Sequence, residues 1–210
     1  AAQLQALSTD QILAMGTGQL ASLSTYNVSS LGTTQLAALY TTGVVSFSTA
    51  QLQSITSAQI TALGTSQLVA LSADQVVGML RPSRTSQLTT GQIAALTTGQ
   101  LVNLITSEIA ALRTDQVVAL RSDHLAALTS VNVLAMASAQ IVVLETADLV
   151  ALSAANMLAL TTSQASSIMT GQIFALTSAQ MVGLGTKNIA ALGTAQLKAI
   201  QTSNIAALTT

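Results

Sequence analysis

Apolar and polar positions recur along this chain with a period of eight residues. The octad reads Thr-x-Gln-(Ile/Leu/Val)-x-Ala-Leu-(Ser/Thr/Gly), and about 26 copies fill the sequence from end to end. We label its positions a to h, with a the usual Thr, so that residues 17–24 form one complete octad. A period this short leaves each unit only its neighbours against which to bury apolar side chains, which is the organising principle of a solenoid.

The spacing of the apolar positions within an octad predicts a helix. Positions d and g are three residues apart, so they lie on one side of a helical turn, whereas in a strand they would face opposite sides. A continuous helix is excluded, because eight residues advance about 800° and the apolar stripe would rotate by about 80° per octad. We therefore predict a helix of about six residues and a two-residue corner. The predicted core consists of d and g side chains, represented by Leu20, Leu23, Leu36, Leu39, Leu101, Leu104, Ile109, Leu112, Leu149, Leu152, Ile189 and Leu192.

Polar residues at the octad boundaries are typical of helix ends. Where h is Ser or Thr, as at Ser8, the Gln three residues later completes a capping box. We expect Gln at c and Thr at a to satisfy the many helix termini. The predicted N-caps are the Thr residues at a, represented by Thr17, Thr33, Thr98, Thr114 and Thr186. Glycine at h predicts left-handed C-terminal caps at Gly16, Gly32, Gly64, Gly185 and Gly193.

The chain is thus expected to form an all-α repeat solenoid, with a β-solenoid of about three octads per coil as the alternative. Thr, Val and Ile suit strands, and Gln at c would form amide ladders in stacked β-structure. We expect a single elongated repeat domain over residues 1–210. One register break, at residues 80–88, separates about 10 regular octads from about 15, since Gln75 and Gln92 are two octads plus one residue apart. It contains the only proline, Pro82, and predicts a bulge or a helix start; the alternative is a hinge, a partner contact or a protease site.

The composition narrows the classes of function. Only 6% of the residues are charged, against about 25% in ordinary soluble domains. The six cations are scattered, which argues against nucleic acid and against an anionic membrane surface. Thr, Ser or Gly interrupts nearly every octad, so no transmembrane segment is expected. The chain lacks cysteine, and it starts inside a repeat without an initiator Met, so we expect it to be a processed or excised piece.

No group of residues predicts catalysis, a cofactor or a metal site. His124 is the only histidine, it replaces Gln at position c, and a catalytic site needs several converging groups. Arg113 with Asp115, and Arg121 with Asp123, are expected to form solvated ion pairs of little energetic weight. The carboxylates Glu108, Glu145 and Asp148 are too dispersed for a calcium loop. We therefore expect no enzymatic activity.

Two surfaces remain as candidates for recognition. Position e is often apolar between Val69 and Val182, and a contiguous apolar surface usually marks an interface. Self-association into a filament or a bundle is the simplest way to bury this apolar surface. The Thr residues at a would line up as a regular hydroxyl face, which is the alternative surface, suited to ice or carbohydrate. The predicted interface residues at e are Val102, Val118, Leu134, Val142, Val150 and Phe174.

The octad string at residues 90–97, Thr-Gly-Gln-Ile-Ala-Ala-Leu-Thr, resembles the octapeptide repeat tracts of very large bacterial surface and secreted proteins of the adhesin type. The resemblance covers the whole chain. It implies an extracellular, non-enzymatic role as a stalk or a self-assembling filament. The binding tips and calcium motifs of those proteins are absent from this sequence. The alternative is a repeat binding module that recognises ice, a glycan or a partner protein through the Thr face.

Overall fold

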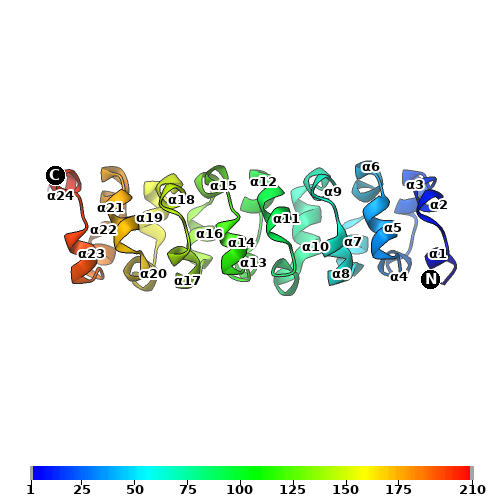
Figure 1. Cartoon of the computed structure of the whole chain (residues 1–210), viewed down its shortest axis with the longest axis horizontal. Coiled ribbons are helices and arrows are strands. Elements are labelled where there is room, and N and C mark those ends of the chain that lie inside the picture. The colour runs from blue at the N-terminus through cyan, green and yellow to red at the C-terminus, as the bar shows by residue number, and fades with distance from the viewer. Residues whose placement is uncertain (1, 209–210) are drawn as a thin grey trace. The chain divides into compact units, whose positions relative to one another are not determined.

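The structure, a computed structural model, describes residues 2–208, and in this range the chain forms 24 α-helices and no strand (Figure 1). The all-α repeat solenoid is therefore confirmed and the β-solenoid alternative is wrong. Contacts divide the chain into two compact units, unit 1 up to Leu104 and unit 2 from Ile105 onward. The expectation of one elongated domain stays a prediction, and the register break lies inside unit 1.

Nearly every octad forms one helix. In unit 1 these are α1 (Ala2–Gln5), α2 (Thr9–Leu13), α3 (Thr17–Ala21), α4 (Thr25–Ser29), α5 (Thr33–Ala38), α6 (Thr41–Val45), α7 (Thr49–Ser54), α8 (Ser57–Ala62), α9 (Thr65–Ala70), α10 (Ala73–Thr85), α11 (Thr90–Ala95) and α12 (Thr98–Val102). In unit 2 they are α13 (Thr106–Ala110), α14 (Thr114–Val118), α15 (Ser122–Ala127), α16 (Ser130–Ala135), α17 (Ser138–Val142), α18 (Thr146–Ala151), α19 (Ala154–Ala159), α20 (Thr162–Ser167), α21 (Thr170–Ala175), α22 (Ser178–Ala190), α23 (Thr194–Lys198) and α24 (Thr202–Leu208).

Two helices are longer because each joins two octads across a non-helical residue. Helix α10 contains Arg81 with φ 46°, and α22 contains Gly185 with φ 72°. The other helices have four to seven residues, too few to be stable in isolation. Packing between coils must therefore hold them in place.

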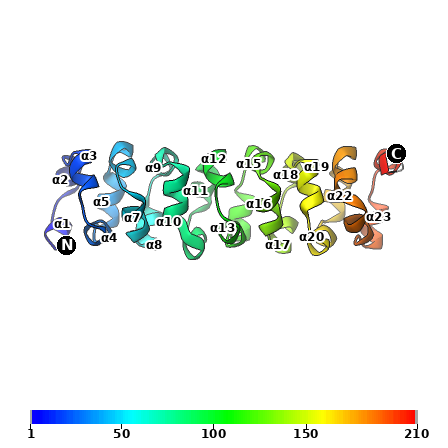
Figure 2. The same ribbon diagram turned by 180° about the vertical axis from the view of Figure 1, so that it is seen from behind.

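Helices stack at a regular interval along the chain. Within unit 1, α3 packs on α6 and α6 on α9, and these three helices lie along the upper edge of Figure 1. Within unit 2, α16 packs on α19 and α19 on α22, as Figure 2 shows from behind. Within each unit, helices thus contact mainly the helices three octads further on. Hydrogen bonds described below link helices four octads apart, so one coil contains between three and four octads.

The core lies inside the coils and consists of the d and g side chains. Ten of the twelve representative core residues are at most 6% exposed. The other two, Leu23 and Ile189, are half-buried. Small residues at f allow coils to approach closely: a Cβ added at Gly183 would lie 2.6 Å from the carbonyl oxygen of Ala154. No helix within residues 2–208 is both long enough and apolar enough to cross a membrane.

The register break is a one-residue bulge inside α10, where the helix is interrupted at Arg81. The inserted residue is accommodated where Arg81 adopts a left-handed conformation, which is uncommon for a residue with a Cβ. The Arg81 guanidinium donates to Oε1 of Gln53 at 3.0 Å, and that of Arg84 donates to the Gln53 carbonyl at 2.9 Å. These two side chains tie the bulge to the preceding coil. The hinge, partner and protease interpretations stay predictions.

Candidate functional site

The most regular polar feature of the structure is a buried amide at position c that joins successive coils. Gln140 accepts a hydrogen bond through Oε1 from the backbone N–H of Ala137, at 2.6 Å. Its Nε2 donates to the carbonyls of Ile109 and Leu112, at 3.0 and 2.7 Å. One side chain therefore closes the N-terminus of its own helix, α17, and the C-terminus of α13, four octads earlier.

The same double bridge recurs through both units. Its carbonyl partners lie 28 and 31 residues earlier in the regular octads, 28 and 30 residues earlier for Gln75, and 29 and 32 residues earlier where the bulge intervenes. These separations lie at or between three octads, 24 residues, and four octads, 32 residues. The Gln residues that make it, besides Gln140, are Gln35, Gln51, Gln59, Gln67, Gln75, Gln92, Gln100, Gln164, Gln172, Gln180 and Gln196.

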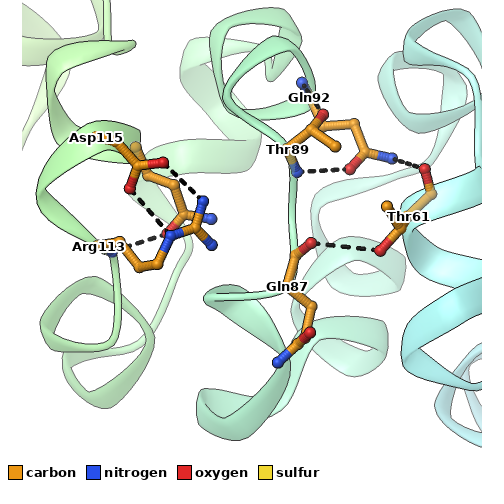
Figure 3. A network of polar contacts seen from close by, with 7 residues as sticks. Thr61, Gln87, Thr89, Gln92, Arg113 and Asp115 are labelled. Carbon is orange, nitrogen blue, oxygen red and sulfur yellow. Dashed lines mark hydrogen bonds and ion pairs between the residues drawn. The ribbon is translucent and has the colours of Figure 1, made fainter.

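Figure 3 shows one such bridge in unit 1. Gln92 accepts from the backbone N–H of Thr89 at 2.9 Å and reaches the carbonyl of Thr61 at 3.5 Å. The Thr61 hydroxyl in turn donates to the carbonyl of Gln87 at 3.4 Å. Gln92 also donates to the buried carbonyls of Ile60 and Leu63, both at 2.8 Å. The coils of unit 1 are thus held by bonds from a side chain to buried backbone carbonyls of an earlier coil.

The N-caps lie one residue before the positions predicted from the sequence. Residue h is extended and its carbonyl accepts the first helical bond, as from Leu20 N–H to Gly16, so h is the cap and a is the first helical residue. Where h is Ser or Thr, its hydroxyl accepts from the N–H of residue c, as from Gln11 to Ser8 at 3.2 Å. The prediction of N-caps at Thr17, Thr33, Thr98 and Thr114 is therefore wrong, and Thr186 follows the left-handed Gly185 inside α22.

The glycines at h are explained by the same geometry. Gly16, Gly32, Gly64 and Gly193 have φ between −65° and −73° and cap the following helix. The prediction of left-handed C-caps is wrong for these four, because the corner needs an extended residue. Of the five glycines at h named in the prediction, only Gly185 adopts a positive φ.

A shorter side chain at c changes the partners of the bridge. Asn156 donates through Nδ2 to the carbonyl of Leu128 at 2.9 Å, but its own helix is capped by Ser153. Its Oδ1 accepts instead from the hydroxyl of Ser130, at 3.3 Å. Asn204 with Ser178, and Asp148 with Ser122, repeat this contact at 2.8 and 2.9 Å. In each pair a Ser at position a serves the c residue three octads later.

Asn188 departs from this pattern. It donates to the carbonyl of Leu160 at 2.9 Å, yet its Oδ1 is a buried side-chain atom with no hydrogen-bond partner in the described residues. Position a, three octads earlier, is Thr162 rather than Ser. An unsatisfied buried acceptor costs about 1–3 kcal/mol.

Two titratable side chains also occupy position c. Glu108 is buried, and its Oε2 accepts from the backbone N–H of Ile105 at 2.9 Å. Burial raises the pKa of Glu108, partly offset by that bond. His124 is fully buried, and its Nδ1 accepts from the backbone N–H of Arg121 at 3.3 Å. Both residues cap a helix as Gln does, which accounts for their presence at c.

The charged pairs lie at the surface of unit 2. Arg113 binds Asp115 at 2.9 Å and Arg121 binds Asp123 at 2.8 Å, with all four side chains exposed. Hydrogen bonds from the guanidinium groups lower the pKa of both aspartates. Figure 3 shows the two-pronged contact between Arg113 and Asp115. Within residues 2–208 no three His, Asp or Glu side chains gather closely enough to hold a metal ion.

The residues predicted as an interface are divided by the structure. Val118, Leu134 and Phe174 are exposed, whereas Val102, Val142 and Val150 are half-buried. Sequence reasoning missed Met169, which is half exposed at position h, where Ser, Thr or Gly is usual. Its departure from the consensus was the available signal.

Two open cavities in unit 2 lie beside these apolar residues. The first, about 810 Å³, is lined by Val142, Val143, Leu144, Glu145, Thr146, Met169, Thr170, Gly171 and Gln172, and we name it the Met169 groove. The second, about 490 Å³, is lined by Phe174, Lys198, Ala199, Ile200, Gln201, Thr202 and Ser203, and we name it the Phe174 ledge. The groove is of the size of ligand sites in general.

Comparison with protein families identifies the repeat. A sequence profile described as the ALTTAQ repeat matches residues 12–49, 28–65, 44–80, 93–130, 141–178 and 173–210, which together are well over half of the chain. The letters of that name correspond to positions f, g, h, a, b and c, as in residues 175–180. No curated protein matches the chain.

Proposed function

We propose that this chain, which belongs to the ALTTAQ repeat family, is an extracellular structural repeat module that forms a stalk or a self-assembling filament at a bacterial surface. The observation that carries the proposal is the amide bridge from position c to the preceding coil. Because each coil binds the backbone carbonyls of an earlier one, repeats extend the stack without any other change. The length of such a module would follow from the number of its octads.

The chemistry of the buried polar groups favours a mechanical over a catalytic role. Glu108, His124 and Asp148 are the most reactive types among the buried side chains, and all three stand at position c. Glu108 and His124 bind a backbone N–H, and Asp148 binds the Ser122 hydroxyl. Each is used to hold the fold, so we propose that the protein has no enzymatic activity.

Self-assembly is tested on the purified chain. Electron microscopy and light scattering over a series of concentrations should reveal uniform fibres or tubes that grow with concentration. Separate particles of constant mass at every concentration would contradict self-assembly and favour a stalk of single chains. The surface location rests on the resemblance to adhesin-type tracts, and antibody labelling of intact producing cells tests it. Labelling that requires permeabilised cells would contradict an extracellular role.

A second candidate function is recognition through the Thr face. Thr17, Thr33 and Thr114 are exposed, and within residues 2–208 no hydrogen bond of their hydroxyls is found. Ordered hydroxyls on a rigid scaffold suit ice or a glycan. Measurements of ice recrystallisation and of glycan binding test this function. Thr33→Val, which keeps the shape and removes the hydroxyl, should weaken any activity found, whereas Thr61→Val, which lies outside the row at a, should not.

A further inference from the structure

We propose that the Met169 groove of one copy of this chain receives the Phe174 ledge of a second copy, with Glu145 of the first paired to Lys198 of the second. This contact rests on the proposed self-assembly and assigns it to a surface. Both halves lie in unit 2, so every copy offers one groove and one ledge. A contact between two different surfaces of identical chains leads to open, growing assemblies when its rotation does not close a ring.

The groove results from three departures from the octad consensus. Val143 stands at f, where small residues are usual, and Glu145 and Met169 stand at h, where Ser, Thr or Gly is usual. The two h residues are three octads apart, and the stacking of helices three octads apart brings both into one cavity. The result is an apolar floor with one exposed carboxylate at its side.

The ledge is the counterpart in charge and carries an exposed aromatic side chain. The chain has two phenylalanines: Phe47 is fully buried in unit 1, whereas Phe174 is 59% exposed. Phe174 lines the second cavity together with Lys198 and is not among the residues that line the groove. It therefore does not fill the groove of its own copy. Large aromatic side chains in an apolar recess are the usual anchors of interfaces.

The groove and the ledge carry charges of opposite sign, and neither charge belongs to an ion pair within the described residues. Every arginine bonds to another group of the chain, to Gln53 from Arg81 and Arg84, and to Asp115 and Asp123 from Arg113 and Arg121. Within residues 2–208 neither Glu145 nor Lys198 has an ion-pair partner. In a chain with 6% charged residues, an acidic side chain at the groove and a basic one at the ledge favour a second copy as the occupant.

The test is a charge exchange between two variants. Glu145→Lys and Lys198→Glu each set like charges against each other in the contact, so each variant alone should need at least about tenfold more protein to assemble. When the two variants are mixed in equal amounts, every groove meets a ledge of opposite charge, and assembly should return to the wild-type concentration. Light scattering at low ionic strength measures this, and salt should weaken the effect.

Matched controls separate this surface from the rest of the apolar positions. Phe174→Ala should also raise the assembly concentration at least about tenfold. Leu134→Ala, exposed at another position e, and Lys187→Glu, another cation without an ion pair in the described residues, should change it by less than about twofold. Circular dichroism of each variant checks that the fold is retained.

The outcomes distinguish this inference from the broader proposal. If the wild-type chain stays monomeric at every concentration, self-assembly itself is wrong. If the wild type assembles but the single variants assemble equally well, or the mixture fails to recover, the groove and the ledge are not the contact and another surface is. An effect of Leu134→Ala equal to that of Phe174→Ala would assign the interface to the e positions in general.

Discussion

The octads of Gln140 and Asn156, two octads apart in unit 2, solve the same problem with side chains that differ by one methylene group. Gln140 caps its own helix and binds two carbonyls of an earlier coil. Asn156 binds one carbonyl of an earlier coil, its helix is capped by the Ser153 hydroxyl, and its Oδ1 accepts from the Ser130 hydroxyl. Both side chains therefore bond to the backbone of an earlier coil, and the second partner of the c side chain differs with its length and with the residue at a three octads earlier.

The largest effect is expected where the longer amide is removed. Gln140→Ala leaves the N–H of Ala137 without its side-chain acceptor and the carbonyl of Leu112 without the Nε2 donor, and it removes one of the two donors to the carbonyl of Ile109, which keeps the N–H of Leu112 at 3.2 Å. Each such group costs about 1–3 kcal/mol, so the free energy of unfolding should fall by about 3–4 kcal/mol. Urea unfolding followed by circular dichroism measures the loss.

Gln11→Ala is the matched control for that change. Gln11 caps Ser8 through Oε1, but its side chain is exposed, and its amide nitrogen has no bond to another residue within the described range. Only a cap is lost, and the Ser8 hydroxyl remains, so the loss should be about 1 kcal/mol or less. Equal losses in the two variants would contradict the bridge as the source of cohesion between coils.

Removing the serine partner tests the shorter amide. Ser130→Ala takes the donor from Oδ1 of Asn156, which is itself buried, and should lower the free energy of unfolding by about 1–2 kcal/mol. Thr162→Ala, at the matching position before Asn188, removes no hydrogen bond from Asn188, and its effect should stay below about 0.5 kcal/mol. Hydrogen exchange of the amides of α19 and α22 localises the two effects. The comparison fails if Thr162→Ala is the more damaging substitution.

The octads of Gln140 and Asn156 also show which features of the fold can be predicted from the sequence. The period of eight and the spacing of d and g predict short helices with two-residue corners; the structure confirms the short helices, and most of the corners between them have two or three residues. The sequence pattern places the N-caps one residue late, because Thr or Ser occupies a in most octads while the residue at h varies more widely, although the Ser8 and Gln11 box marks h. That capping box predicts one of the two roles of Gln at c, the cap on its own helix.

The other half depends on how coils stack, which no local pattern contains. The carbonyl partners of Gln140 are 28 and 31 residues away, and the Ser130–Asn156 pair is 26 residues apart. These distances follow from a coil of between three and four octads, which side-chain packing sets. The Met169 groove also depends on stacking. Each residue that departs from the octad consensus can be recognised in the sequence, but only the stacking of coils brings these residues into one cavity.

Glu108 places a carboxylate at position c, so it can be compared with the neutral amide of Gln140. Glu108 has the shape of Gln but lacks its donor, and burial raises its pKa above the usual 4.5. The folded state therefore holds the proton more tightly than the unfolded state, so stability is greatest below about pH 4.5 and falls as pH rises through the raised pKa. Glu108→Gln should remove this dependence and increase the free energy of unfolding at pH 7 by about 1–2 kcal/mol.

The measurement is urea unfolding of both proteins between pH 4 and pH 8. The curves should converge at acidic pH, where Glu108 is protonated, and separate as the pH rises. Asp74→Asn, a substitution of an exposed carboxylate, should leave the wild-type curve nearly unchanged. A constant offset between Glu108→Gln and wild type across this range would contradict the role of the buried charge.

The smallest effect is expected from supplying the partner that Asn188 lacks. Ser turns more freely about χ1 than the β-branched Thr, so Thr162→Ser should allow the hydroxyl to reach Oδ1 of Asn188 as Ser130 reaches Asn156. One hydrogen bond to a buried acceptor should raise the free energy of unfolding by about 0.5–1 kcal/mol. Thr162→Ser combined with Asn188→Ala should lose this gain, because the acceptor is absent. A gain that persists in the double variant would come from Ser itself, and the Ser–Asn pairing would then not govern this position.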